Sequence, residues 1–239
     1  SSYIVERCTC RSYEYWQGHD HRDANITTYN SSMKWLADQG VWVLRMGKIM
    51  AKKIPSLHPR IIDYAFHSDK SDLLDIWLFA NCTGCISSSN GIDVISRAYG
   101  RPSISINAVP VRHPLYSFNL IYVPKYQRWS KKHKNFTIKE IVLPPNGIEI
   151  NNTNEIIEQG VELVDLSPDE IMEAVKEFWE RIQGTWIESK EDRILQQRFW
   201  DNFLDYNSKA LDGHFHGWKH PDARIGSAWL LSQEKDFFT

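Results

Sequence analysis

Side chains that could bind a phosphate group follow several apolar runs of this sequence. Arg45 and Lys48 come after the run at 41–44, and Arg11 comes after a run that begins at Tyr3. Another run is followed by a polar turn made of Ser87, Ser88, Ser89, Asn90 and Gly91. Hydroxyls, backbone N–H groups and guanidinium groups are common ligands of phosphate anions. If these runs are parallel strands, the sequence predicts an anion site at their carboxyl edge.

The polar turn by itself permits two interpretations. It lies between a short strand-like run and the pattern Ile92, Val94, Ile95 and Ala98, which is typical of one face of a helix. The positive end of a helix and its unpaired N–H groups favour an anion. An ordinary capped helix has the same sequence signature. The turn is neither GxGxxG nor GxxxxGK[ST], so it predicts neither a dinucleotide fingerprint nor a P-loop.

Three residues could accept a proton from a hydroxyl group during catalysis. His21 and Asp23 lie in the polar stretch at 18–29, and Asp63 follows Ile61 and Ile62. The polar stretch is also compatible with a solvated surface loop or a metal site, and Asp63 could instead cap the next element. Because no third ligand accompanies His19 and His21, we predict no metal and no cofactor.

The cysteines occur in two pairs, Cys8 with Cys10 and Cys82 with Cys85. Zinc and disulfides both use closely spaced cysteines. The second pair straddles a predicted helix end and a buried strand, which is unlike a zinc knuckle. We therefore predict free structural thiols in a reducing compartment.

The elements that must position these residues alternate between strand and helix patterns as far as residue 110. Apolar runs predict strands, and capped segments of helical period predict helices, at 3–10, 31–37, 41–44, 61–64, 73–80, 84–87, 92–98 and 103–109. This alternation predicts an α/β fold, a Rossmann-like parallel sheet with helices on both faces. Such sheets bind ligands at the carboxyl ends of their strands, near the point where the strand order reverses.

The remaining chain is less regular. Strands are predicted at 119–125 and 160–164, and the segment at 138–143 fits either a helical turn or a strand. Ser167, Pro168 and Glu170 begin a helix that ends at Gly184. We predict a Rossmann-like domain over 1–184, with a helical C-terminal extension over 185–239 packed on it.

Composition narrows the class of protein. The 239 residues carry a net charge of -2, which gives no reason to expect nucleic-acid binding. The sequence contains no run of 18 apolar residues and no signal-peptide pattern at its start. We therefore expect no transmembrane segment and a cytoplasmic location.

Taken together, several segments resemble one family of bacterial proteins assigned as glycosyltransferases. Their order is CxCR near the start, then HRDANITTY, GVWVLRMGK, IIDYA and ISSSNGIDVISRAYGRPSISIN. Later segments of similar kind are LIYVPKY, FTIKEI, GVELVDLSPDEIMEAVKEF and RIGSAWL. The resemblance covers nearly the whole chain, and RMG, IIDYA and SSNG are its most specific parts.

This resemblance implies the C-terminal, donor-binding half of a GT-B glycosyltransferase. It implies that Arg11, Arg45 and the turn at 87–91 hold the diphosphate of a nucleotide sugar, and that a glycan accepts the sugar in polysaccharide synthesis. It also implies a further N-terminal domain or a partner subunit. This sequence departs from the family pattern at Thr9 and Ser12, where the family has His and Asp.

Two other functions remain open from the sequence. The loss of the His and Asp beside Arg11 favours a non-catalytic module that binds a nucleotide, a glycan or a partner protein. An independent enzyme that modifies nucleotide sugars is the third possibility, and it would turn over without an acceptor.

Overall fold

A computed structural model of the chain describes residues 2–5, 23–48, 50, 52–88, 91–109, 120–143, 153–210, 220–233 and 235–239. Its strands are β1 (Ser2–Val5), β2 (Val43–Met46), β3 (Ile61–Ile62), β4 (Gly84–Ser87), β5 (Ser103–Ala108), β6 (Leu120–Pro124), β7 (Tyr126–Trp129), β8 (Lys134–Asn135), β9 (Val161–Val164) and β10 (Arg224–Ile225). Its α-helices are α2 (Asn30–Asp38), α3 (Asp72–Asn81), α4 (Val94–Ala98), α5 (Ile138–Val142), α6 (Thr153–Glu158), α7 (Pro168–Gln183), α8 (Lys190–Ala210) and α9 (Ser227–Leu231). Two 3-10 helices are η2 (Ile26–Tyr29) and η3 (Tyr64–Phe66).

The main sheet has seven strands in the order β10-β6-β5-β4-β1-β2-β3. Every neighbouring pair in it is parallel. Counted from β3, the first six strands follow the chain order 3-2-1-4-5-6, which is the order of dinucleotide-binding Rossmann sheets. The predicted α/β class with a parallel sheet is therefore confirmed, and the topology is compatible with a Rossmann-like fold.

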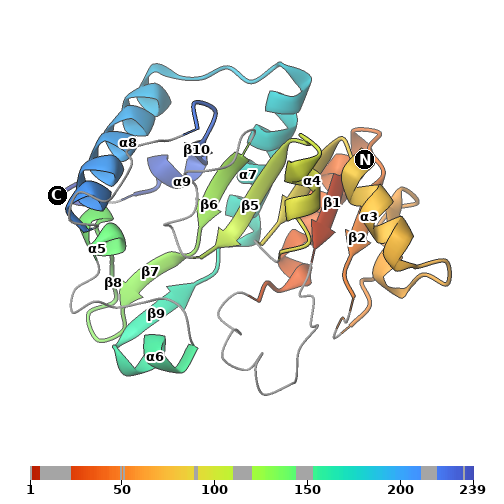
Figure 1. The fold of residues 1–239 in the computed structure, drawn as a ribbon, viewed down its shortest axis with the longest axis horizontal. Helices are drawn as coiled ribbons and strands as arrows, with labels where there is room; N and C mark the ends of the chain where they lie inside the picture. The colour runs from red at the N-terminus through yellow and green to blue at the C-terminus, as the bar shows by residue number, and fades with distance from the viewer. Residues whose placement is uncertain are drawn as a thin grey trace.

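Helices cover both faces of this sheet (Figure 1). α2 and α7 lie on one face, and α3 and α4 lie on the other. Because side chains alternate along a strand, Cys85 of β4 joins the apolar cluster beside α3, whereas Ile86 joins the cluster that includes α2 and α7. A Cβ atom on Gly84 would lie 2.8 Å from Phe178 and 2.8 Å from Ile182, so the glycine lets α7 approach β4 closely.

A second, smaller sheet continues from the carboxyl end of β6. Lys125 alone separates β6 from β7, and β7 pairs antiparallel with β8 and β9 in the order β8-β7-β9. Helix α6 packs on β9 (Figure 1). This small sheet and α6 therefore border the edge at which the main parallel strands end.

The segment at 138–143, which fitted either a helix or a strand, contains α5. Thr137 accepts a hydrogen bond from the backbone N–H of Glu140, whose carboxylate accepts one from the Thr137 N–H in return. This capping box begins the short helix.

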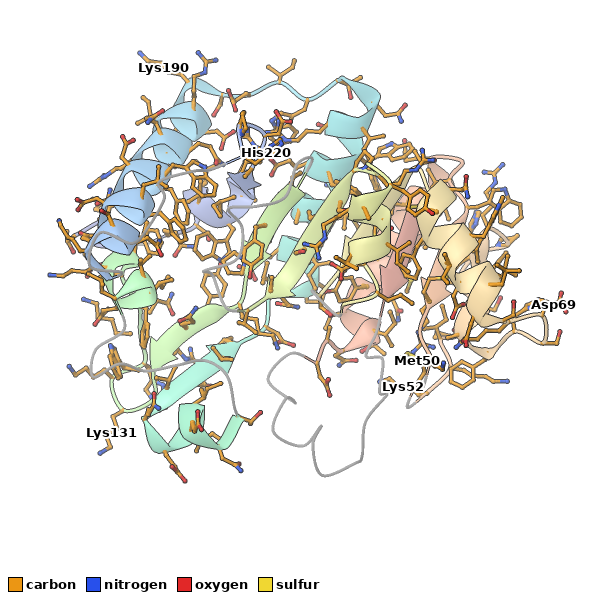
Figure 2. The ribbon with its side chains drawn as sticks, viewed as in Figure 1. Met50, Lys52, Asp69, Lys131, Lys190 and His220 are labelled. Atoms are coloured by element: carbon orange, nitrogen blue, oxygen red, sulfur yellow. The ribbon has the colours of Figure 1, made fainter. Side chains whose placement is uncertain are left out.

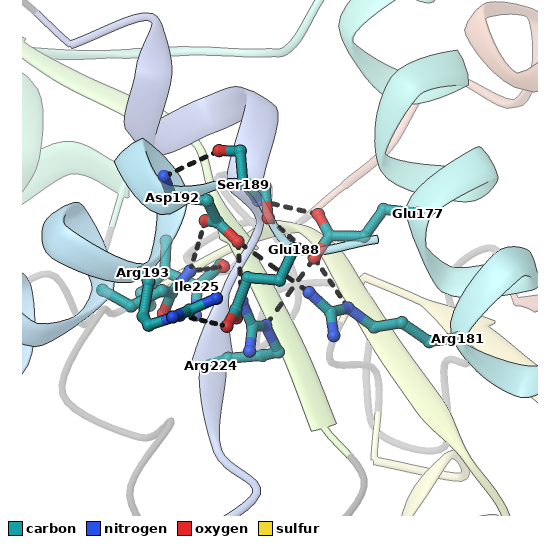
Figure 3. Close-up of polar contacts among 10 residues, drawn as sticks. Glu177, Arg181, Glu188, Ser189, Asp192, Arg193, Arg224 and Ile225 are labelled. Atoms are coloured by element: carbon teal, nitrogen blue, oxygen red, sulfur yellow. Dashed lines mark hydrogen bonds and ion pairs between the residues drawn. The ribbon is translucent and has the colours of Figure 1, made fainter. Parts of the chain in front are cut away.

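The C-terminal extension predicted at 185–239 also contributes β10 to the main sheet. A buried ionic network attaches it to α7 (Figure 3). Glu177 accepts hydrogen bonds from the Ser227 backbone N–H at 2.7 Å and from its hydroxyl at 3.0 Å. Arg224 Nε lies 3.7 Å from Glu177 Oε1, and within the extension Arg224 also donates to Glu188 at 2.9 Å and to Asp192 at 3.0 Å. The extension is thus bound to the rest of the chain by buried charges as well as by apolar packing.

Candidate functional site

The order of the strands reverses between β1 and β4. These two strands are parallel neighbours with Ser2 opposite Gly84 and Ile4 opposite Ile86. The chain therefore leaves β1 after Val5 and leaves β4 after Ser87 at the same edge and side by side. Ligands of parallel α/β sheets bind in the crevice at this position.

The polar turn predicted to bind an anion follows β4 at this point. Ser87 and Ser88 are almost fully buried, while Ser89 and Asn90 lie outside the described residues. Gly91 has a φ of +84°, and a Cβ atom there would meet no atom within 4 Å. The structure therefore confirms the positive φ predicted for Gly91 and leaves open space beside it.

The helix after this turn differs from its prediction. It spans only five residues, Val94–Ala98, rather than 92–98. Asp93 occupies its N-cap position, is 1% exposed and lies 3.3 Å from Arg97. A short helix preceded by a carboxylate offers little positive potential to an anion. Binding at this turn would therefore depend on backbone N–H groups and on cations from neighbouring strands.

Arg45, predicted to contact a diphosphate, instead lies inside the protein. Its side chain is 0% exposed, and its Nη1 donates to Asp63 Oδ1 at 3.0 Å and to the Lys52 carbonyl at 3.2 Å. The other Asp63 oxygen accepts a hydrogen bond from the Ile54 backbone N–H at 3.0 Å. The proposed anion ligand and one of the proposed bases are therefore partners of each other in this structure.

Of the two predicted cations that the structure describes at this edge, Lys48 is the one whose side chain reaches solvent. Its side chain is 52% exposed, and its Nζ lies 3.2 Å from Asp72 Oδ1. Ion pairs this exposed are weak and exchange with other anions. Lys70 donates to the carbonyls of Gly47 and Lys48, which fixes the backbone at the end of β2. Arg11 and His21 lie outside the described residues.

Asp23 borders a cavity of about 510 Å³ that is also lined by residues of α6 and β9. Lys125 and Asp165 line the same cavity, and their charged atoms are 2.7 Å apart. The sequence interpretation missed these two residues. Lys125 ends the strand predicted at 119–125 and Asp165 directly follows the strand predicted at 160–164, so the strand-end position that singled out Asp63 would also have identified them.

A second cavity, of about 340 Å³, lies at the opposite edge of the main sheet. Its lining includes Pro102, which precedes β5, and Arg224, which begins β10. Arg181 also lines it and donates to Glu177 at 2.9 Å (Figure 3). Because both arginines already contact buried acids and parallel sheets bind ligands at the other edge, we place the candidate site at the carboxyl ends of the strands.

Cys82 and Cys85 are free and buried, as predicted for structural thiols. Burial raises the pKa of both thiols, that of Cys85 well above its usual value. Within the described ranges, no group of three His, Cys, Asp or Glu side chains is arranged to hold a metal ion. Nor do the helices described there include one with the length and apolar character needed to span a bilayer.

Comparison with known proteins adds no assignment. The chain matches no family model, no curated protein and no solved structure.

Proposed function

We propose that the chain is the donor-binding half of a GT-B-type glycosyltransferase, which binds a nucleotide diphosphate sugar where β1 meets β4. The sequence resemblance supplies the class, through the RMG, IIDYA and SSNG segments. The parallel sheet and its strand order supply an edge suited to a nucleotide.

One observation carries this proposal. The pairing of β1 with β4 brings the start of the segment that contains Arg11 beside the start of the polar turn at 88–91. Lys48 follows β2, which is the neighbour of β1 on the other side. A diphosphate bound here has N–H groups and hydroxyls from one loop and cations from two others, which is the donor set that phosphate oxygens require.

The chemistry follows from that placement. An acceptor hydroxyl oxygen forms a bond to the anomeric carbon of the donor sugar, and the bond from that carbon to the diphosphate oxygen breaks. The bonding electrons leave with the diphosphate, and Arg11, Lys48 and the turn stabilise the new charge. The hydroxyl proton passes to a base. We assign this role to Asp23, which borders the cavity beside this edge of the sheet.

Calorimetry with UDP, GDP, ADP and CMP sugars tests the donor site. We expect one of these nucleotide sugars to bind, and we expect Arg11→Ala and Lys48→Ala each to weaken that binding at least tenfold. Loss of a hydrogen bond to a charged group costs about 1.5 to 3 kcal/mol, and tenfold corresponds to about 1.4 kcal/mol.

Lys190→Ala is the matched control, because Lys190 is an exposed lysine at the start of α8, at the far side of the molecule (Figure 2). It should bind the donor like the unchanged chain. Failure of all four classes of nucleotide sugar to bind, or equal losses in Lys48→Ala and Lys190→Ala, would contradict the proposed site.

A non-catalytic binding module is the second candidate. Thr9 and Ser12 replace the family's His and Asp, and Asp93 places a carboxylate at the start of α4. A bound nucleotide sugar that is neither hydrolysed nor transferred, by the chain alone or mixed with a complementary N-terminal half, would favour this module. Turnover without any acceptor would favour the enzyme that modifies nucleotide sugars.

A further inference from the structure

The cavity beside Asp23 has two chemically different sides. Its volume of about 510 Å³ is within the range of small-molecule sites. One side is aliphatic and is formed by α6 and β9, with Ile156, Ile157, Val161 and Leu163. The other side is polar, with Asp23, Lys125 and Asp165. A ligand that fits here has one apolar face and one face rich in hydrogen-bonding groups.

The polar side is held in place before any ligand arrives. Lys125 is 5% exposed, and its ammonium group pairs with Asp165 and donates to the Asp23 backbone carbonyl at 3.0 Å. A buried ammonium needs such partners to offset its loss of water. The residue after Asp165 is also fixed, because the Leu166 N–H donates to Asn107 Oδ1 at 2.8 Å.

Asn107 is itself an unusual residue. It is fully buried, has a φ of +57°, and lies at an irregularity in the pairing of β5 with β6. Left-handed backbone is uncommon for residues other than glycine, and it persists where the surrounding structure requires it. Here it lets one side chain bridge from the end of β5 to the segment that carries Asp165.

The charges of this cavity favour a ligand that donates hydrogen bonds. Three acidic residues, Asp23, Glu162 and Asp165, are among the residues that line it, against one lysine, Lys125. Lys125 is already paired with Asp165, and Arg128 donates to both oxygens of Glu162, at 2.9 and 3.0 Å. This arrangement repels a phosphate group. It suits the hydroxyls of a sugar ring, whose C–H face can lie against the isoleucines.

The position of the cavity separates it from the proposed diphosphate site. Lys125 follows β6, which is two strands from β4. Since neighbouring strands are about 4.8 Å apart, the two sites are about 10 Å apart along one edge. We propose that this cavity binds the sugar ring of an acceptor glycan. The assignment of this ring to an acceptor rests on the proposed glycosyltransferase function. The binding of a sugar ring in this cavity is independent of that function.

Saturation-transfer NMR and calorimetry on the 239-residue chain test this inference. The probes are glucose, galactose, mannose, N-acetylglucosamine and their disaccharides, with nucleotide sugars measured separately. The key variant is Ile157→Arg, because Ile157 is 66% exposed and a larger side chain there narrows the cavity without removing a core residue. The matched control is Ile187→Arg, at an isoleucine that is 88% exposed and does not line the cavity.

We expect at least one of these sugars to bind. Ile157→Arg should weaken that binding tenfold or more, and Ile187→Arg should leave it unchanged. Nucleotide-sugar affinity should be the same in both variants. The inference fails if none of the sugars binds, or if Ile157→Arg binds them as the unchanged chain does. It also fails if Ile157→Arg weakens the binding of nucleotide sugars instead, because the ring bound in the cavity would then belong to the donor. Sugar binding that depends on Ile157 without any nucleotide-sugar binding would support the cavity and refute the donor site.

Discussion

At the scale of single residues, Arg45 shows how one side chain type permits two opposite roles. Guanidinium groups bind phosphates, and they also pair with buried carboxylates. In this fold Arg45 holds Asp63, the Lys52 carbonyl and, at 5.5 Å, the ring of Phe66. These contacts join the ends of β2 and β3 to the loop that connects them.

Arg45→Ala should therefore destabilise the protein. Asp63 is 17% exposed, and breaking a buried pair by removing one partner costs about 3 to 5 kcal/mol. Urea unfolding followed by circular dichroism measures the change. Arg193→Ala is the control, because Arg193 is 70% exposed and its pair with Glu188 should contribute less than about 1 kcal/mol. Normal stability of Arg45→Ala with lost nucleotide-sugar binding would show that Arg45 is a ligand residue.

At the scale of elements, much of this architecture could be predicted from the sequence. Capped segments of helical period identified α3 and α7, short apolar runs identified β2 and β4, and the alternation of isoleucine with serine and asparagine identified β5. β3 (Ile61–Ile62) lies within the strand predicted at 61–64, whereas β10, with two residues, is too short to give a periodic signal. β10 in particular exists because its neighbour β6 supplies the hydrogen bonds.

The pairing of site residues was harder to predict than the elements. Val43 lies opposite Ile61 and Leu44 opposite Ile62, a register that continues to bring Arg45 beside Asp63. Both residues stood out in the sequence, but their partnership depends on which strands are neighbours. The pairing of Lys125 with Asp165 depends in the same way on how the strands of the second sheet pair, and these strands are short.

The contact between β7 and α7 predicts a dependence of stability on pH. The Tyr126 hydroxyl donates to Glu170 Oε1 at 2.5 Å. Burial and this hydrogen bond raise the pKa of Tyr126 from 10.0 to about 12. The folded state therefore favours the neutral phenol, so its contribution is complete below pH 10 and is lost as the pH rises from 10 to 12.

Tyr126→Phe removes that contribution. Below pH 10 we expect the variant to be about 1.5 to 3 kcal/mol less stable, the usual value of a hydrogen bond to a charged group, and the difference should shrink toward pH 12. Urea unfolding at pH 8, 10 and 11.5 measures it. Tyr99→Phe is the control, at a tyrosine that is 62% exposed. A difference that stays constant over this range would contradict the assignment.

At the scale of the whole molecule, one apolar cluster crosses the domain boundary predicted at 184. Phe199 and Phe203 of α8 and Trp229 of α9 belong to the same buried cluster as Ile104 of β5 and Phe178 of α7. Glu177 of α7 also accepts hydrogen bonds from Ser227. A domain is expected to have a core of its own, and the segment at 1–184 shares its core with the extension.

A truncated chain of residues 1–184 should therefore fail to form the native structure. Truncation removes β10 from the sheet, exposes the apolar faces of α5 and α7, and leaves Glu177 without its Ser227 partner. We expect dispersed amide signals in the NMR spectrum of the full chain and collapsed signals in that of 1–184. Adding residues 185–239 as a separate polypeptide should restore dispersion, because the missing contacts come from that segment. A cooperative unfolding transition in 1–184 alone would instead establish it as an independent domain and make the extension an accessory to the fold.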